Sequence, residues 1–120
     1  MAIRCLIVDD NQSFLDAARK LLEQQGLTVV GVASTSEEAL RETEALRPDV
    51  VLVDVALGEE SGFELARRLV AEHGRAVTVI LISTRAEADL VELVADSPAA
   101  GFLSKSDLSA SSIRALLESG

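Results

Sequence analysis

The stretch LIVDDNQ (residues 6–12) joins a run of buried-type side chains to two adjacent carboxylates, Asp9 and Asp10. Residues 3–8 are almost entirely apolar, which predicts a strand that ends where the acidic pair begins. Asp is common at turns and at helix starts, so one of the two could cap a following helix. One cap needs only one carboxylate, however, and Asn11 or Ser13 could already serve. We therefore interpret the pair as a candidate metal-binding site.

Composition restricts the chain to a few classes of protein. With 120 residues, 48% of them hydrophobic, it has the size of one ordinary domain and can bury a continuous core. The formal net charge of −9 leaves no basic patch for a polyanion, and the absence of Trp and Tyr removes common stacking partners for bases. We therefore expect no direct nucleic-acid binding by this chain.

The cysteine content and the N-terminal sequence indicate the cellular compartment. The single cysteine, Cys5, cannot form an intramolecular disulfide, and it lies in an apolar run where a thiol behaves as a small buried hydrophobe. The N-terminal sequence MAIRCLIV has neither the long apolar region of a signal peptide nor a membrane span of roughly 20 apolar residues. We expect a cytoplasmic protein without membrane contact.

Two kinds of segment alternate along the chain. Short apolar runs predict strands over residues 3–8, 27–33, 49–55, 76–83 and 100–104. Apolar residues at helical spacing predict helices over residues 13–24, 35–46, 61–73, 86–95 and 109–119. Ser36 is the predicted N-cap of the second helix. Uninterrupted apolar strands indicate burial on both faces, so the predicted fold is α/β, a doubly wound parallel sheet.

Ligands of such sheets bind at the carboxyl ends of the strands. The predicted third strand, DVVLVDV (49–55), carries Asp54 near that end. If it neighbours the first strand, three carboxylates converge, and like charges at short range destabilise the fold. A divalent cation would resolve this conflict, and ligands that are all oxygen suit Mg²⁺. The sequence therefore predicts a magnesium site formed by Asp9, Asp10 and Asp54.

Two further strand-end residues suit a phosphoryl group. Ser83, at the end of the fourth predicted strand, can donate a hydrogen bond to a phosphoryl oxygen, and Lys105, after the fifth, supplies a compact positive charge. A carboxylate flanked by Mg²⁺ and a lysine is a nucleophile that can form an aspartyl phosphate. Asp54 is the best placed, because its strand is expected at the centre of the sheet.

The sequence resembles the receiver domain of bacterial response regulators through its strand-end residues: Asp9, Asp10, Asp54, Ser83 and, in GFLSK, Lys105. The resemblance covers residues 3–119. It implies a flavodoxin-like sheet of five strands in the order 2-1-3-4-5, flanked by five helices. It also implies a single receiver domain over residues 1–120.

The resemblance assigns roles to individual residues. It makes Asp54 the phosphoacceptor and adds the backbone carbonyl of Ala56 to the Mg²⁺ ligands Asp9, Asp10 and Asp54, with Asp9 acting mainly through a metal-bound water. Lys105 would contact the phosphoryl group, and Ser83 would move toward it after transfer. Phe102 takes the place of the family's aromatic switch residue, which is often Tyr, and it could instead be a core residue. Ala56 and Arg85 are expected to tune the lifetime of the phosphate.

The chain departs from the family pattern at two loops. The loop VALGEESG (55–62) lacks the frequent Met-Pro pair, although Gly62 keeps the turn before the third helix. Lys105 is followed by Ser106 where relatives usually have Pro. A peptide bond before a residue other than proline is expected to be trans.

These residues predict a phosphorylation-controlled signalling module and not an enzyme acting on external substrates. A sensor histidine kinase or phosphotransfer protein would supply the phosphoryl group. An output protein of unknown identity would read the change on the face formed by helix four, strand five and helix five. Phosphorylation could also promote a dimer. The chemistry of the chain itself would be limited to Mg²⁺-dependent self-phosphorylation and slow loss of the phosphate.

Other interpretations remain open. The chain could be the receiver half of a DNA-binding transcriptional regulator, truncated before a helix-turn-helix domain, or a receiver-like scaffold that no longer uses phosphate. A phosphohydrolase is disfavoured because Ala56 stands where such enzymes usually carry a second Asp. A flavin carrier is disfavoured because DDNQS (9–13) would repel the flavin phosphate.

Overall fold

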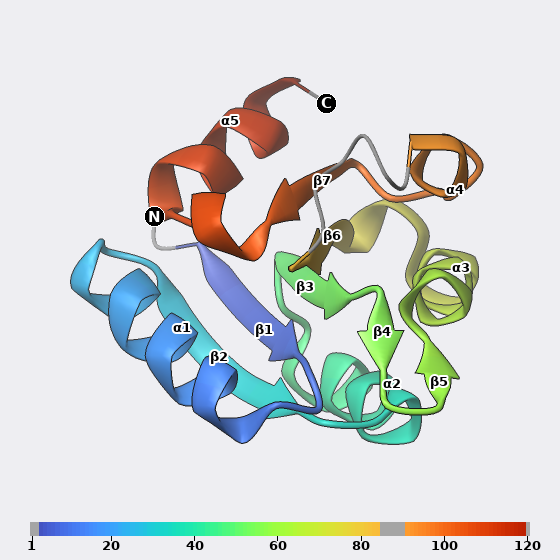
Figure 1. Cartoon of the computed structure of the whole chain (residues 1–120), viewed down its shortest axis with the longest axis horizontal. Coiled ribbons are helices and arrows are strands. Elements are labelled where there is room, and N and C mark those ends of the chain that lie inside the picture. Colours follow the sequence, from blue (N-terminus) through green and yellow to red (C-terminus); the bar gives the residue numbers. More distant parts are fainter. Residues whose placement is uncertain (1–2, 85–90, 120) are drawn as a thin grey trace.

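The computed structural model describes residues 3–84 and 91–119. Its centre is a parallel sheet of five strands in the order β2-β1-β3-β6-β7 (Figure 1). The strands are β1 (Arg4–Val8), β2 (Thr28–Ala33), β3 (Val50–Asp54), β6 (Thr78–Ser83) and β7 (Gly101–Ser104). Because β6 and β7 are the fourth and fifth strands of this sheet, the predicted order 2-1-3-4-5 is confirmed.

Helices cover both faces of the sheet, as the doubly wound prediction requires. They are α1 (Gln12–Gln24), α2 (Ser36–Leu46), α3 (Gly62–His73), α4 (Val91–Ala95) and α5 (Ala110–Ser119). In Figure 1, α1 and α5 lie on one face, and α2, α3 and α4 lie on the other. Part of the predicted helix 86–95 lies outside the described residues. Among the described residues, no helix combines the length and apolar character needed to cross a membrane.

The central strand shows why uninterrupted apolar runs form this fold. All residues of β3 are buried, and consecutive side chains enter different cores. Val51 and Val53 pack with the α2 and α3 side, whereas Val50 and Leu52 pack with the α1 and α5 side. Since side chains alternate across a strand, both faces must be apolar, which leaves no polar alternation in the sequence.

The N-cap of helix α2 lies one residue earlier than predicted, although the helix itself begins within the predicted range 35–46. Thr35, in extended conformation, is the N-cap, and its side chain accepts the hydrogen bond of the Glu38 N–H. The predicted cap, Ser36, is already the first helical residue. The prediction was wrong because two adjacent hydroxyl residues offer equivalent caps, and their residue types alone do not distinguish them.

The connection from β3 to α3 contains a short hairpin that the sequence does not predict. Strand β4 (Ala56–Leu57) pairs antiparallel with β5 (Glu60–Ser61). Gly58, with φ of 61°, lies in the turn between them, where a left-handed conformation favours glycine. The hairpin gives the segment after Asp54 a defined backbone path.

The connection after β7 contains the Lys105–Ser106 peptide bond, which is predicted to be trans. A short 3₁₀ turn, Lys105–Asp107, follows β7 directly. No cis peptide bond occurs within the described part of the chain, so the Lys105–Ser106 bond is trans, as predicted.

Candidate functional site

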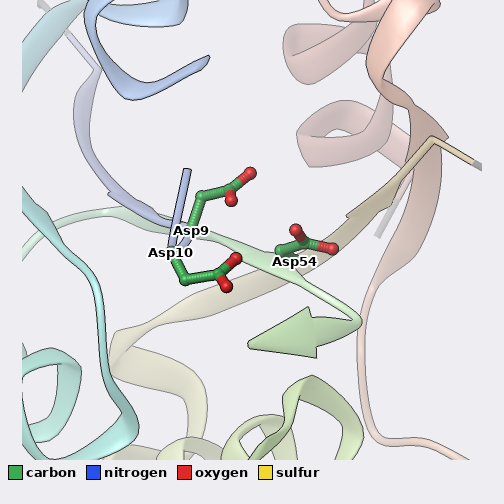
Figure 2. A group of neighbouring side chains, drawn as sticks. All are labelled: Asp9, Asp10 and Asp54. Carbon is green, nitrogen blue, oxygen red and sulfur yellow. The ribbon is translucent and has the colours of Figure 1, made fainter. Parts of the chain in front are cut away.

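Three carboxylates meet at the carboxyl edge of the sheet. Asp9 and Asp10 directly follow β1, and Asp54 is the last residue of the neighbouring strand β3. One carboxylate oxygen from each residue lies within 4.8 Å of the others, and Figure 2 shows the three side chains gathered at this edge. Asp9 is fully buried and Asp54 is nearly so, whereas Asp10 is exposed. The predicted convergence is therefore present.

Among the residues that the structure describes, Lys105 is the only cation that forms ion pairs with this cluster. Its Nζ donates a hydrogen bond of 3.1 Å to Asp54 Oδ2 and forms an ion pair of 2.5 Å with Asp9 Oδ2. Three carboxylates and one ammonium leave two formal negative charges at the site. A divalent cation would balance them.

Burial and charge act in opposite directions on the two central groups. Burial raises the pKa of Asp54, and the Asp9 charge raises it further. The Ala56 N–H and Lys105 lower it, but the pKa stays above its ordinary value. Burial alone would lower the pKa of Lys105, yet its contacts with Asp9 and Asp54 raise it overall. Lys105 is therefore firmly protonated.

The second oxygen of Asp54 is held by its own loop. Asp54 Oδ1 accepts the N–H of Ala56 at 3.1 Å, at the start of the hairpin. Gly62 packs directly behind: a Cβ there would lie 2.0 Å from the Asp54 backbone oxygen. The Gly62 N–H also donates to Val55 O at 2.9 Å. These contacts fix both the backbone and the carboxylate plane of Asp54.

An open pocket of about 490 Å³ contains most of the predicted site residues. Its lining is Asp9, Asp10, Asn11, Asp54, Val55, Ala56, Phe63, Ser83, Thr84, Leu93 and Lys105. Ser83 is 3% exposed at the end of β6, the strand next to β3. The carboxylates, the serine and the lysine thus come together from four strand ends, while the role of the Ala56 carbonyl as a ligand stays a prediction.

Two predicted residues are not placed in this pocket. Phe102 is 8% exposed and packs in the core on the α2 and α3 side, in agreement with the core interpretation of this residue. Its role as a switch stays a prediction. Arg85 lies outside the described residues, so its predicted tuning role also remains untested.

Phe14 and Asn11 lie at the site, but the sequence indicated neither as a site residue and offered Asn11 only as a possible helix cap. The Phe14 ring, in the first turn of α1, lies under Lys105, with Nζ 4.2 Å from the ring centroid. Asn11 caps α1 by accepting the Phe14 N–H, and its own N–H donates to Asp9 Oδ1. Helical spacing marks Phe14 as a core residue, and no local signal relates it to a lysine so distant in sequence.

The donor set fits a hard divalent cation. The clustered groups are carboxylates, with no His or Cys among the described candidates, and hard cations prefer oxygen ligands. Asp10 is exposed, so a hydrated ion could reach the cluster from solvent. The three carboxylates gather at one place, and one lysine leaves two of their negative charges unbalanced. Both observations also favour a divalent cation.

Comparisons with known proteins show the family of the chain. Residues 5–118 match the family described as response regulator receiver domain. The response regulator GacA of Pseudomonas viridiflava is 35% identical over 104 residues, which make up 86% of this chain and 48% of GacA. The chain thus spans about half the length of the curated relatives with which it aligns over 104 residues.

Solved structures show the same fold. The signal receiver domain of NarL from Mycobacterium tuberculosis has a TM-score of 0.83 at 28% identity, covering 98% of this chain and 95% of that chain. A response regulator from Burkholderia pseudomallei, solved with a phosphorylated aspartic acid and a calcium ion, has a TM-score of 0.78 at 29% identity, covering 96% and 66%. The chain belongs to the response regulator receiver domain family of two-component signal transduction.

Proposed function

We propose that Asp54 is the phosphoacceptor of this receiver domain and that the reaction depends on Mg²⁺. The observation that carries the proposal is the position of Asp54 at the end of the central strand. One of its oxygens accepts the Ala56 N–H, and the other accepts a hydrogen bond from Lys105. This arrangement presents a fixed carboxylate beside a positive charge, which suits a nucleophile for phosphoryl transfer.

The transfer step follows from these contacts. An Asp54 carboxylate oxygen forms a bond to phosphorus while the phosphorus–nitrogen bond of a donor phosphohistidine breaks, and the imidazole keeps the electron pair. Lys105 offsets negative charge on the phosphoryl oxygens, and Ser83 lies at the same pocket to donate a hydrogen bond. Mg²⁺, held by Asp9, Asp10, Asp54 and the Ala56 carbonyl, would supply charge neutralisation for those oxygens. Attack by water on phosphorus later restores the carboxylate and releases phosphate.

A solved relative supports the chemistry. The Burkholderia pseudomallei response regulator described above contains a phosphorylated aspartic acid and a calcium ion. In this chain, Asp54 would take the place of the phosphorylated aspartic acid, and the acidic pair Asp9 and Asp10 would hold the ion. Phosphorylation would come from a sensor histidine kinase or phosphotransfer protein, and an output protein would respond to the phosphorylated form.

Intact-mass spectrometry after incubation with Mg²⁺ and acetyl phosphate tests the proposal. The expected result is one phosphoryl adduct, absent with EDTA and absent in Asp54→Asn. Asp16→Asn, at an exposed carboxylate on α1, is the matched control and should retain the adduct. An adduct that persists in Asp54→Asn would reject Asp54 as the acceptor. Absence of both an adduct and Mg²⁺ binding in the unmodified chain would favour the phosphate-independent scaffold.

A second candidate places this receiver within a longer regulator. The curated relatives that align over 104 residues are about twice as long as the aligned region, which favours a receiver half joined to an output domain. In the alternative, residues 1–120 form a stand-alone receiver. The reading frame that encodes the chain distinguishes the two: a continuation beyond Gly120 into a further domain supports the longer regulator, and a stop codon there contradicts it.

A further inference from the structure

The Phe14 ring contacts the ammonium group of Lys105. Nζ lies 4.2 Å from the ring centroid, well inside the distance at which a cation over a ring face is attracted. The Lys105 side chain is only 14% exposed, so water weakens this attraction less than at a surface site. The contact joins the first turn of α1 to the residue that follows β7.

The contact closes a ring of interactions around the acidic loop. Asp9 Oδ1 accepts the Asn11 N–H at 2.9 Å, and Asn11 Oδ1 accepts the Phe14 N–H at 3.1 Å. The Phe14 ring then meets Lys105, whose Nζ returns to Asp9 as an ion pair. Asn11 thus contacts Asp9 through its backbone N–H and fixes the backbone of Phe14 through its side chain.

A purely packing role explains only part of this geometry. Phe14 is partly buried and packs against the core on the α1 and α5 side, which a leucine could also do. Only an aromatic side chain, however, offers a ring face with negative charge density to the ammonium. Lysine has a flexible stem, so a third partner besides Asp9 and Asp54 reduces the number of positions that Nζ can occupy.

We propose that Phe14 is a positioning residue that holds the Lys105 ammonium over Asp54. Its effect on phosphoryl transfer rests on the proposed function of Asp54, but the contact itself does not. Phe14 attracts the ammonium whatever the charge on Asp54, so it keeps Lys105 at the site when the carboxylate is modified and its charge is redistributed.

Nuclear magnetic resonance tests the contact without any phosphorylation. Lys20 and Lys105 are the only lysines of the chain, and Lys20 is exposed, so it serves as an internal reference. Protons at Cε of Lys105, above a ring face, should resonate upfield of those of Lys20. Phe14→Leu should abolish the difference and Phe14→Tyr should keep it. Phe63→Leu, which removes another ring that lines the pocket, is the matched control and should also keep it.

Phosphorylation kinetics test the consequence. At saturating Mg²⁺, we expect Phe14→Leu to react with acetyl phosphate about three- to tenfold more slowly, with the rate restored in Phe14→Tyr. An unchanged rate in Phe14→Leu would overturn the positioning role. Coincident Lys20 and Lys105 proton shifts in the unmodified chain would overturn the contact, even if Phe14→Leu failed to fold. Failure of the unmodified chain to react would instead count against the proposed function, while the resonance test would still decide the contact.

Discussion

Lys105 and Asp54 are joined across 51 residues by a hydrogen bond of 3.1 Å between Nζ and Oδ2. The same Nζ pairs with Asp9, so one ammonium serves two buried carboxylates. Removal of the lysine would leave both without a positive partner among residues 3–84 and 91–119, whereas removal of one carboxylate would relieve repulsion. The lysine is therefore expected to contribute to stability as well as to chemistry.

Lys105→Met should lower the free energy of unfolding by about 1–3 kcal/mol in the absence of divalent ions, because two buried carboxylates lose their partner. Urea denaturation in EDTA measures this change. Lys20→Met is the matched control, since Lys20 is exposed and its replacement should cost less than about 0.5 kcal/mol. Equal costs for the two substitutions would contradict the structural role of the Lys105 pairs.

Mg²⁺ should stabilise the fold through the acidic cluster. At ten times its dissociation constant, an ion that binds only the folded state adds about 1.4 kcal/mol to the free energy of unfolding. Asp10→Asn should abolish this gain without destabilising the ion-free protein, because Asp10 is exposed and the replacement removes a like charge. Asp16→Asn should keep the full gain. Thermal or urea denaturation with and without Mg²⁺ measures both, and an undiminished gain in Asp10→Asn would refute the assigned ligand.

Gly62→Ala should destabilise the protein by about 2 kcal/mol or more, because the new Cβ would lie 2.0 Å from the Asp54 backbone oxygen and the backbone must move. Gly31→Ala provides the comparison: its nearest neighbour is a flexible Leu46 methyl group at 3.0 Å, so we expect a smaller cost. Chemical denaturation compares the two. The folded fraction of Gly62→Ala should also be phosphorylated more slowly, since Asp54 is displaced. Similar costs at the two glycines would argue against close packing behind Asp54.

Cys5 should make the free energy of unfolding fall at alkaline pH. Burial raises the pKa of this thiol from 9.0 to about 12 in the folded state, so above pH 9 the unfolded chain loses a proton that the folded chain keeps. The free energy of unfolding must then fall as pH rises, by up to about 1.4 kcal/mol per pH unit. Lys105, whose pKa is also raised, adds a loss in the same direction only above 10.5. The chain has no Tyr, which makes the range from pH 9.0 to 10.5 diagnostic.

Urea denaturation across this range measures the slope. Cys5→Ala removes the titrating thiol and should therefore flatten this dependence on pH. The space left by the smaller side chain changes the absolute free energy of unfolding but not its slope with pH. A slope that is unchanged in Cys5→Ala would show that another group is responsible. The buried thiol should also react with a thiol reagent only when the protein is unfolded.

The strands of the sheet and the polar residues at their ends could be predicted from the sequence for one physical reason. Strands buried on both faces must be continuously apolar, so each polar residue that ends a run, such as Asp54 or Ser83, marks a carboxyl end. Parallel strands bring those ends to one edge. Which strands are neighbours did not follow from the apolar pattern. The strand order, and with it the convergence of Asp9, Asp10 and Lys105 with these residues, was implied by the family resemblance.

Other features depend on backbone geometry that no residue pattern encodes. The hairpin of Ala56–Leu57 and Glu60–Ser61 has strands of two residues each, too short for an alternation signal. Thr35 rather than Ser36 caps α2, and the types of these two hydroxyl residues do not distinguish them. The Phe14 ring meets Lys105 only in the folded chain, which brings the first turn of α1 to the residue that follows β7. The helical spacing of Phe14 therefore indicated core packing alone.

The most direct test of the central claim is to locate the phosphoryl group. Borohydride reduction of the chain after treatment with Mg²⁺ and acetyl phosphate converts an aspartyl phosphate to homoserine, which peptide mass spectrometry assigns to a position. We predict homoserine at position 54 alone, and none when EDTA is present. Homoserine at another aspartate, or a phosphoryl adduct that borohydride does not convert, would contradict the assignment of Asp54 as the phosphoacceptor.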